Sequence, residues 1–279
     1  MCKYQYINSK NVFDGDVMDY EETFDKLKYF IKTGIIVLSI LVLIVLGIKY
    51  IPEAIHVTNS ATSVDLPIYA VDQDKKVLSL SFESNMNSQN TEQILEILSV
   101  YDVKATFFIT GEWAAKFKDE TKAIAAAGHD IGNNSENHKD LTLLSKQETI
   151  EEILNQHTRI KELTGVDMNL FRAPYGEFNN SLLDITNDLG YYCIQWNIDS
   201  LDWKDYGVES IIKTIVYHDS LNNGSIIRMH NGSKYTAEAL DAVISYLQEE
   251  GYTFVPISQL IYSDDFYIDE TGTQFEKNK

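Results

Sequence analysis

The chain has 279 residues, of which 44% are apolar and 11% aromatic. That is enough for one large domain or two small ones, and it excludes a small fold held together by disulfides. The 23 basic and 42 acidic residues give a formal net charge of −19. Because so acidic a surface repels a phosphate backbone, we expect no nucleic-acid partner. The two cysteines, Cys2 and Cys193, lack the spacing of a metal site.

A membrane-spanning helix is predicted near the N-terminus, over residues 33–50. Residues 33–48 carry no charge and consist mostly of Ile, Leu and Val. Lys32 and Lys49 flank this run and can extend to the two membrane surfaces. The alternative is a buried core helix, but such a helix would keep polar residues on one face.

The distribution of basic residues predicts the orientation of this helix. Three lysines immediately precede the apolar run, whereas no Lys or Arg lies between Lys49 and Lys75. The positive-inside rule therefore places residues 1–32 in the cytoplasm and the C-terminal domain outside the cell, as a single-pass cell-membrane protein. The exported part then holds 17 basic and 36 acidic residues, so nearly all of the acidity lies outside the cell.

The rest of the chain alternates between short apolar runs and helical periodicity. We predict a stalk over residues 51–75, a folded domain over 76–262 and an acidic tail over 263–279. The strand-like runs are at 77–82, 105–110, 130–132, 169–172, 191–196, 225–230 and 252–257, with helical patterns between them. Seven such units predict a mostly parallel α/β sheet. No glycine-rich phosphate loop follows the first strand, so a distorted (β/α) barrel is favoured over a doubly wound sheet.

Residues of functional types follow five of the predicted strands. These clusters lie at 82–85, 133–138, 172–175, 199–203 and 229–231. Parallel barrels carry their sites at the carboxyl ends of the strands, so the clusters are expected to converge on one face.

The clusters and the strings around them resemble the polysaccharide deacetylase family, a group of carbohydrate esterases with a NodB-homology domain. The strings are KATFFITGEWA, AAGHDIGN, LFRAPYG, DSLDW and IIRMH. The likeness covers about residues 76–262 and is greatest to the sporulation-associated branch. It implies a distorted barrel that removes acetyl groups from N-acetylated cell-wall sugars with the help of a divalent metal such as zinc.

The resemblance also assigns roles to residues of the five clusters. Glu83 takes the position of the catalytic base, and Arg172 would orient its carboxylate. His230 would be the general acid, with either Asp199 or Asp202 holding its proton. Arg172 could instead simply pair with Glu83 and close the barrel mouth, and the two aspartates could cap the turn that follows them.

Three further residues are expected to contact the substrate. Trp203 would form a wall of the sugar pocket, Tyr175 would offer a main-chain donor to the oxyanion, and Met229 would lie beside the substrate.

The metal site departs from the family pattern. The family's T-F-D-D reads S-F-E-S here, so Ser84 stands at a ligand position. The family's H-[ST]-x-x-H reads N-S-E-N-H, so Asn134 replaces one histidine and only His138 remains. Glu83 is one methylene longer than aspartate and could itself reach a metal, and Glu136 could also contribute. A hydroxyl, an amide and a single imidazole are a poor ligand set for zinc.

Three functions therefore stay open at this stage. The first is an anchored deacetylase acting on cell-wall N-acetyl sugars. The second is a degenerate family member that binds glycan, or scaffolds wall or spore assembly, without turnover. The third is a glycosidase that uses Glu83 with another carboxylate at the barrel mouth. The glycan, the acyl group, the metal and the oligomeric state are not determined by the sequence.

Overall fold

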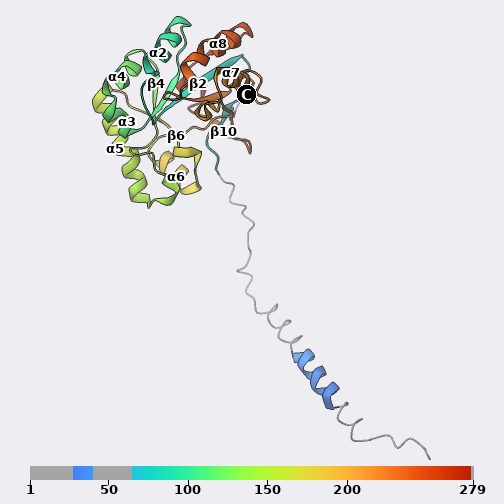
Figure 1. Cartoon of the computed structure of the whole chain (residues 1–279). Helices are drawn as coiled ribbons and strands as arrows, with labels where there is room; N and C mark the ends of the chain where they lie inside the picture. The colour runs from blue at the N-terminus through green and yellow to red at the C-terminus, as the bar shows by residue number, and fades with distance from the viewer. Residues whose placement is uncertain (1–27, 40–64, 278–279) are drawn as a thin grey trace, which may run out of the picture. The chain divides into compact units, whose positions relative to one another are not determined.

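A parallel sheet of eight strands forms the centre of the folded unit (Figure 1). The computed structural model describes residues 28–39 and 65–277. The strand order is β6-β5-β4-β3-β2-β8-β7, with β9 also paired to β2. The strands are β2 (Val77–Ser84), β3 (Thr106–Ile109), β4 (Asp130–Asn133), β5 (Leu170–Phe171), β6 (Tyr192–Cys193), β7 (Ile198–Asp199), β8 (Ile226–His230) and β9 (Thr253–Phe254).

Helices connect these strands and surround the sheet (Figure 1). They are α2 (Thr91–Val100), α3 (Gly111–Lys116), α4 (Lys118–Ala126), α5 (Lys146–Thr164), α6 (Asn180–Asp188), α7 (Val208–Val216), α8 (Thr236–Glu249) and α9 (Ile257–Leu260). Helix α5 shows how the sequence sets its bounds. Ser145 and Glu148 form a capping box at its start, and Gly165 ends it in the left-handed conformation at φ 79°.

The predicted α/β architecture is confirmed, and each of the seven predicted strands overlaps an observed strand. Two details differ. The helical pattern between the second and third predicted strands forms two helices, α3 and α4, because Phe117 leaves the helical region at φ −119° and ψ 62°. The short strand β7, paired with β8, follows β6 without an intervening helix and was not expected as a strand of its own.

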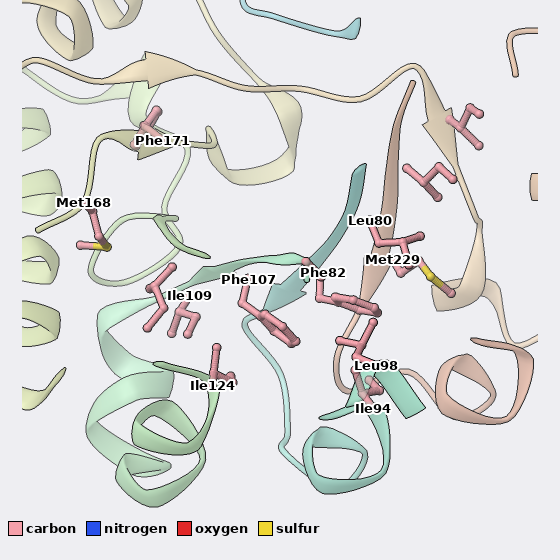
Figure 2. Packing of buried hydrophobic residues seen from close by; sticks show 14 of the residues in the cluster. Leu80, Phe82, Ile94, Leu98, Phe107, Ile109, Ile124, Met168, Phe171 and Met229 are labelled. Carbon is pink, nitrogen blue, oxygen red and sulfur yellow. The ribbon is translucent and has the colours of Figure 1, made fainter. Parts of the chain in front are cut away.

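The main hydrophobic core lies between the sheet and the helices (Figure 2). Phe82 of β2 and Phe107 of β3 stack with ring centroids 5.0 Å apart, and both are fully buried. Leu80, Ile94 and Leu98 pack around them. These contacts fix β2 at the centre of the sheet and so fix the strand end that carries Glu83.

The hydrogen-bonded path of strands does not close into a complete barrel, because β6 and β7 are its two ends. A segment that precedes β2 bridges this opening. The Ile68 amide donates to the Cys193 carbonyl (2.8 Å), and the Gln195 amide donates to the Ile68 carbonyl (2.7 Å). On the other side, the Val71 amide donates to the Gly224 carbonyl, just before β8 (3.0 Å). The barrel is thus open at one seam and crossed there by residues 68–71.

The folded unit extends beyond the predicted limits of 76 and 262. Residues assigned to the stalk include strand β1 (Ala70–Val71), and residues assigned to the acidic tail form β10 (Phe266–Ile268) and β11 (Thr273–Glu276). These three strands make a second sheet in the order β1-β11-β10. The tail is therefore folded through Glu276. The acidic composition of this tail obscured a short apolar pattern in the sequence. Phe266, Ile268 and Phe275 belong to that pattern and are only partly exposed.

The predicted membrane span lies largely outside the described residues. Residues 28–39 form a helix, and residues 40–50 of the span are not described. Within 28–39 and 65–277, no helix combines the length and apolar character needed to cross a membrane.

Gln274 provides a test that the C-terminal strands belong to the fold. Its side chain is fully buried, accepts from the Tyr262 amide (2.9 Å) and donates to the Tyr262 carbonyl (2.7 Å). We predict that Gln274→Ala lowers the free energy of unfolding by about 1–3 kcal/mol in urea titrations, because both backbone groups lose this partner. The neighbouring exposed Gln259→Ala is the control and should change stability little. Equal stability of the two variants would contradict a structural role for the tail.

Candidate functional site

A cavity of about 500 Å³ opens at the carboxyl ends of β2 and β8. This is where the parallel strands were expected to bring the five clusters together. The residues lining the cavity are Glu83, Asn85, Met86, His138, Tyr175, Trp203, Arg228 and His230.

Glu83 lies at the base of this cavity, beside His230 of the neighbouring strand β8. Only 5% of its surface is exposed. One carboxylate oxygen, Oε1, lies 3.7 Å from Arg228 Nη1 and 3.9 Å from Arg172 Nη1. The other, Oε2, lies 3.8 Å from His230 Nε2. Two guanidinium groups thus compensate the buried charge of this carboxylate.

Arg172 enters from β5 and is completely buried. Its Nη2 donates to the Ser81 hydroxyl (3.0 Å) and to the Gln195 carbonyl (3.1 Å), and its guanidinium lies 4.0 Å from the centre of the Phe108 ring. Burial lowers the pKa of Arg172 to about 9, and the attraction of Glu83 opposes this effect. The side chain therefore stays charged at neutral pH. It faces the Glu83 carboxylate, but its hydrogen bonds are to the barrel interior.

His230 and Asp202 form a tightly held pair. His230 Nδ1 lies 2.7 Å from Asp202 Oδ1, and the His230 amide donates to Oδ2 at 2.7 Å. The Thr236 hydroxyl also donates to Oδ2. Burial acts to raise the pKa of Asp202, but the hydrogen bonds from His230 and Thr236 outweigh it and leave the pKa below its usual range. The aspartate thus holds the ring with Nε2 directed towards Glu83.

Of the two aspartates considered as the partner of His230, the structure selects Asp202. Asp199 instead pairs with Arg228, whose Nη2 lies 3.1 Å from Oδ2. The Arg228 guanidinium also lies 3.8 Å from the centre of the Trp196 ring. Arg228 was missed by the sequence reasoning. Its signal was present, because it precedes His230 by two positions on a buried strand and must point to the same face.

The same alternation corrects the expectation for Met229. Its side chain is fully buried and packs in the core with Leu80 and Phe82, away from the cavity (Figure 2). A residue between two cavity-facing neighbours on a strand must face the opposite side. Tyr175 and Trp203 do line the cavity, with 64% and 49% of their surfaces exposed.

His138 is the one family-type metal-ligand position that faces the cavity. Its amide donates to the Ser135 hydroxyl at 3.0 Å. The preceding residue, Asn137, donates through its amide and side chain to the buried Glu152 of α5, both at 2.8 Å. Burial lowers the pKa of His138, and the attraction of Glu83 only partly opposes this effect, so the ring is neutral at pH 7.

The other two ligand positions are taken up by the protein's own hydrogen bonds. The buried Ser84 hydroxyl accepts from Asn231 Nδ2 (3.2 Å), and the buried Asn134 side chain donates to the Arg172 carbonyl (3.0 Å). Glu136, the other acid considered, is paired with Arg159. Within 28–39 and 65–277 there is no group of three His, Cys, Asp or Glu side chains that could hold a metal ion. These residues do not fit the divalent metal that the resemblance implies.

Comparison with known proteins decides the family. The polysaccharide deacetylase family model matches residues 70–194. The peptidoglycan-N-acetylmuramic acid deacetylase PdaA of Bacillus subtilis is 30% identical over 225 residues, which are 78% of this chain and 83% of PdaA. The chain belongs to the polysaccharide deacetylase family. An uncharacterised 30.6 kDa protein of Geobacillus stearothermophilus is 34% identical over 71% of this chain and 76% of its own length. Of the peptidoglycan-N-acetylglucosamine deacetylase PgdA of Listeria monocytogenes, the chain spans only 46%.

Solved structures show the same fold. BA3943 of Bacillus anthracis, described as a pseudoenzyme of carbohydrate esterase family 4, matches with a TM-score of 0.67 and 29% identity over 75% of this chain and 73% of its own. A mutant of BA3943 is described as having restored enzymatic activity. The family therefore includes active deacetylases and at least one inactive member.

The Asp202–His230 pair yields a prediction on stability and pH. In Asp202→Asn the charge is lost and an amide N–H₂ group must face backbone and imidazole N–H donors, so we expect unfolding to require about 3 kcal/mol less at pH 7. Because the folded pKa is depressed, the contribution of Asp202 is complete above the unfolded value of about 3.9 and is lost as the pH falls below it. The gap between the variant and the natural chain should therefore shrink below about pH 4.

Urea unfolding at a series of pH values from about 3 to 7, which begins below the ordinary pKa of an aspartate, measures this effect. Asp205→Asn, at an exposed carboxylate three residues further on, is the matched control. A gap that is small at pH 7, or that does not change with pH, would contradict the pairing.

Proposed function

We propose that this chain is a membrane-anchored, extracytoplasmic member of the family that binds N-acetylated cell-wall glycan without metal-dependent hydrolysis. The observation that carries the proposal is that the sugar-binding and proton-donating residues face the cavity, whereas two of the metal-ligand positions do not. The residues that would hold the sugar and donate a proton line it, while two of the three metal-ligand positions are buried in internal hydrogen bonds.

The loss of the metal follows from the chemistry of the donors. Zinc affinity comes from thiolate, imidazole and carboxylate ligands, and here a hydroxyl and an amide replace two of them. Both replacements are fully buried. The Ser84 hydroxyl accepts from Asn231, and the Asn134 Nδ2 group donates to the Arg172 carbonyl, while Asn134 Oδ1 has no hydrogen-bond partner among the described residues. The likeness to BA3943, described as a pseudoenzyme, adds support.

Glycan binding is supported by the shape and charge of the cavity. Trp203 and Tyr175 offer half-exposed aromatic faces at its rim, where a sugar ring can stack. The strongly acidic chain would repel an anionic wall polymer, whereas an N-acetylglucosamine strand is neutral.

A deacetylase is the second candidate, because the Asp202–His230 pair and Glu83 are in place. Proton transfer of this kind contributes a rate factor of about 10²–10⁴. That factor alone does not replace the polarisation of an amide carbonyl that a metal provides, which ranks this activity second.

A glycosidase is not supported by the cavity. That reaction generally needs two carboxylates flanking the scissile bond. Among the described residues that line the cavity, Glu83 is the only carboxylate. Asp202 is fully buried and hydrogen bonded to His230, and Asp199 is paired with Arg228.

The binding proposal is tested on the full chain purified in detergent. We expect N-acetylglucosamine oligomers to bind by titration calorimetry, with no acetate released in zinc or in a chelator. Trp203→Ala should weaken binding about tenfold, because the stacking surface is lost. Tyr217→Ala, at an exposed aromatic on α7, is the control. Zinc-dependent acetate release would establish the deacetylase instead, and absence of binding would overturn the proposal.

The anchor is tested in cells. Two lysines within the apolar run, Leu41→Lys with Val45→Lys, should move the protein out of the membrane fraction. Each charge near the middle of a membrane helix costs about 2.5–3.5 kcal/mol on insertion. Ser60→Lys is the control outside the run, and protease added to intact cells should digest the C-terminal unit of the natural chain. A membrane fraction unaffected by the two lysines, or a protected C-terminal unit, would contradict this topology.

A further inference from the structure

Asn85 lies between the surviving metal-ligand position and the base position. It directly follows β2 and lines the cavity. Its Nδ2 is 3.0 Å from His138 Nε2 and 3.4 Å from Glu83 Oε2. One side-chain amide nitrogen therefore faces both groups.

The orientation of this amide follows from its neighbours. The Glu83 carboxylate lies beside two guanidinium groups, and its oxygens serve as hydrogen-bond acceptors. The amide N–H₂ group supplies two donors, one for Glu83 and one for the lone pair of His138 Nε2. In the opposite orientation the amide oxygen would face the carboxylate oxygen, which is repulsive.

A metal ion and this amide would use the same lone pair. A neutral imidazole binds a metal through an unprotonated ring nitrogen, and His138 Nε2 is that nitrogen on the cavity side. While Nε2 accepts from Asn85, its lone pair is occupied. A metal must therefore displace a hydrogen bond in addition to finding its missing ligands.

We propose that the Asn85 side-chain amide takes the place of the metal ion, so that replacing Ser84 and Asn134 restores only weak metal binding until Asn85 is removed as well. The proposal rests on the proposed function, in which the natural chain holds no metal. It makes Asn85 a third determinant of metal loss, beyond the two ligand positions. If the Asn85 side chain could instead rotate away from His138 at no cost in free energy, its removal would not change the metal affinity.

The test compares zinc affinities by titration calorimetry of the full chain in detergent. The Ser84→Asp, Asn134→His variant should bind Zn²⁺ weakly. Adding Asn85→Ala should tighten binding about tenfold, the equivalent of one released hydrogen bond. Asn87→Ala in the same double variant is the matched control, because that amide donates to the Gly232 carbonyl and not to His138.

Equal zinc affinity with and without Asn85→Ala would overturn the proposal, as would a triple variant that binds no zinc while keeping the natural circular dichroism spectrum. A second measurement uses the natural chain and does not depend on an engineered metal site. Nitrogen-15 NMR of the natural chain should show His138 protonated at Nδ1 and unprotonated at Nε2, and the opposite tautomer would overturn the proposal. Zinc-dependent acetate release by the natural chain would instead refute the proposed function, so the two failures are distinguishable.

Discussion

The ion pairing around Glu83 is the constraint on which the rest of the site depends. A carboxylate that is only 5% exposed at the end of the central strand would cost several kcal/mol without compensation. Arg172 from β5 and Arg228 from β8 supply that compensation, and the Trp196 ring lies against both guanidinium groups. Because the charge balance is provided by fixed side chains, the mouth of the barrel keeps its geometry without a cation. A site organised in this way can lose its metal and still be folded.

The two halves of the site differ in how deeply they are built into the barrel. His230 and Asp202 are joined by a pair of short hydrogen bonds, and Thr236 at the start of α8 adds a third. Removing either partner would leave a buried charge or hydrogen-bond donor without a partner and would destabilise the fold. The Asp202–His230 pair is therefore needed for stability, whatever its function. The metal half depended on exposed lone pairs, and these are satisfied by internal donors: Asn231 for Ser84 and Asn85 for His138. If the chain has the glycan-binding function proposed above, a few polar substitutions at one strand end and one loop account for its difference from a deacetylase.

Much of this architecture could be predicted from the sequence, because period-two runs and capping signals are local. Strands β2 to β6, β8 and β9 were identified on that basis. The misplaced residue, Met229, and the missed one, Arg228, have the same cause. The order of the motifs shows which strand end is functional, but only the pleat shows which of three adjacent side chains faces the cavity. Asn85 was quoted as part of a cluster, yet its contact with His138 joins residues 53 positions apart. Such a contact depends on the register of β2, β3 and β4.

The partner of His230 could not be chosen from sequence, because Asp199 and Asp202 both precede it within one strand end and turn. The choice is made by η3 (Asp202–Lys204), which turns Asp202 inward, and by Arg228, which draws Asp199 away. The folded tail was hidden for a different reason. Its strands are only three and four residues long. Strand β11 pairs with β1, about two hundred positions earlier in the chain, and β10 pairs with β11.

The seam crossed by residues 68–71 has a mechanical consequence. Any tension along the chain from the N-terminal side arrives first at Ile68 and Val71, whose backbone hydrogen bonds join the β6 side of the barrel to the β8 side. The load is thus shared between two edges of the sheet at once, and β11 supports the same segment from outside through its parallel pairing with β1. Force on the chain from its N-terminal side would therefore load hydrogen bonds to both edges of the open sheet rather than to one edge alone.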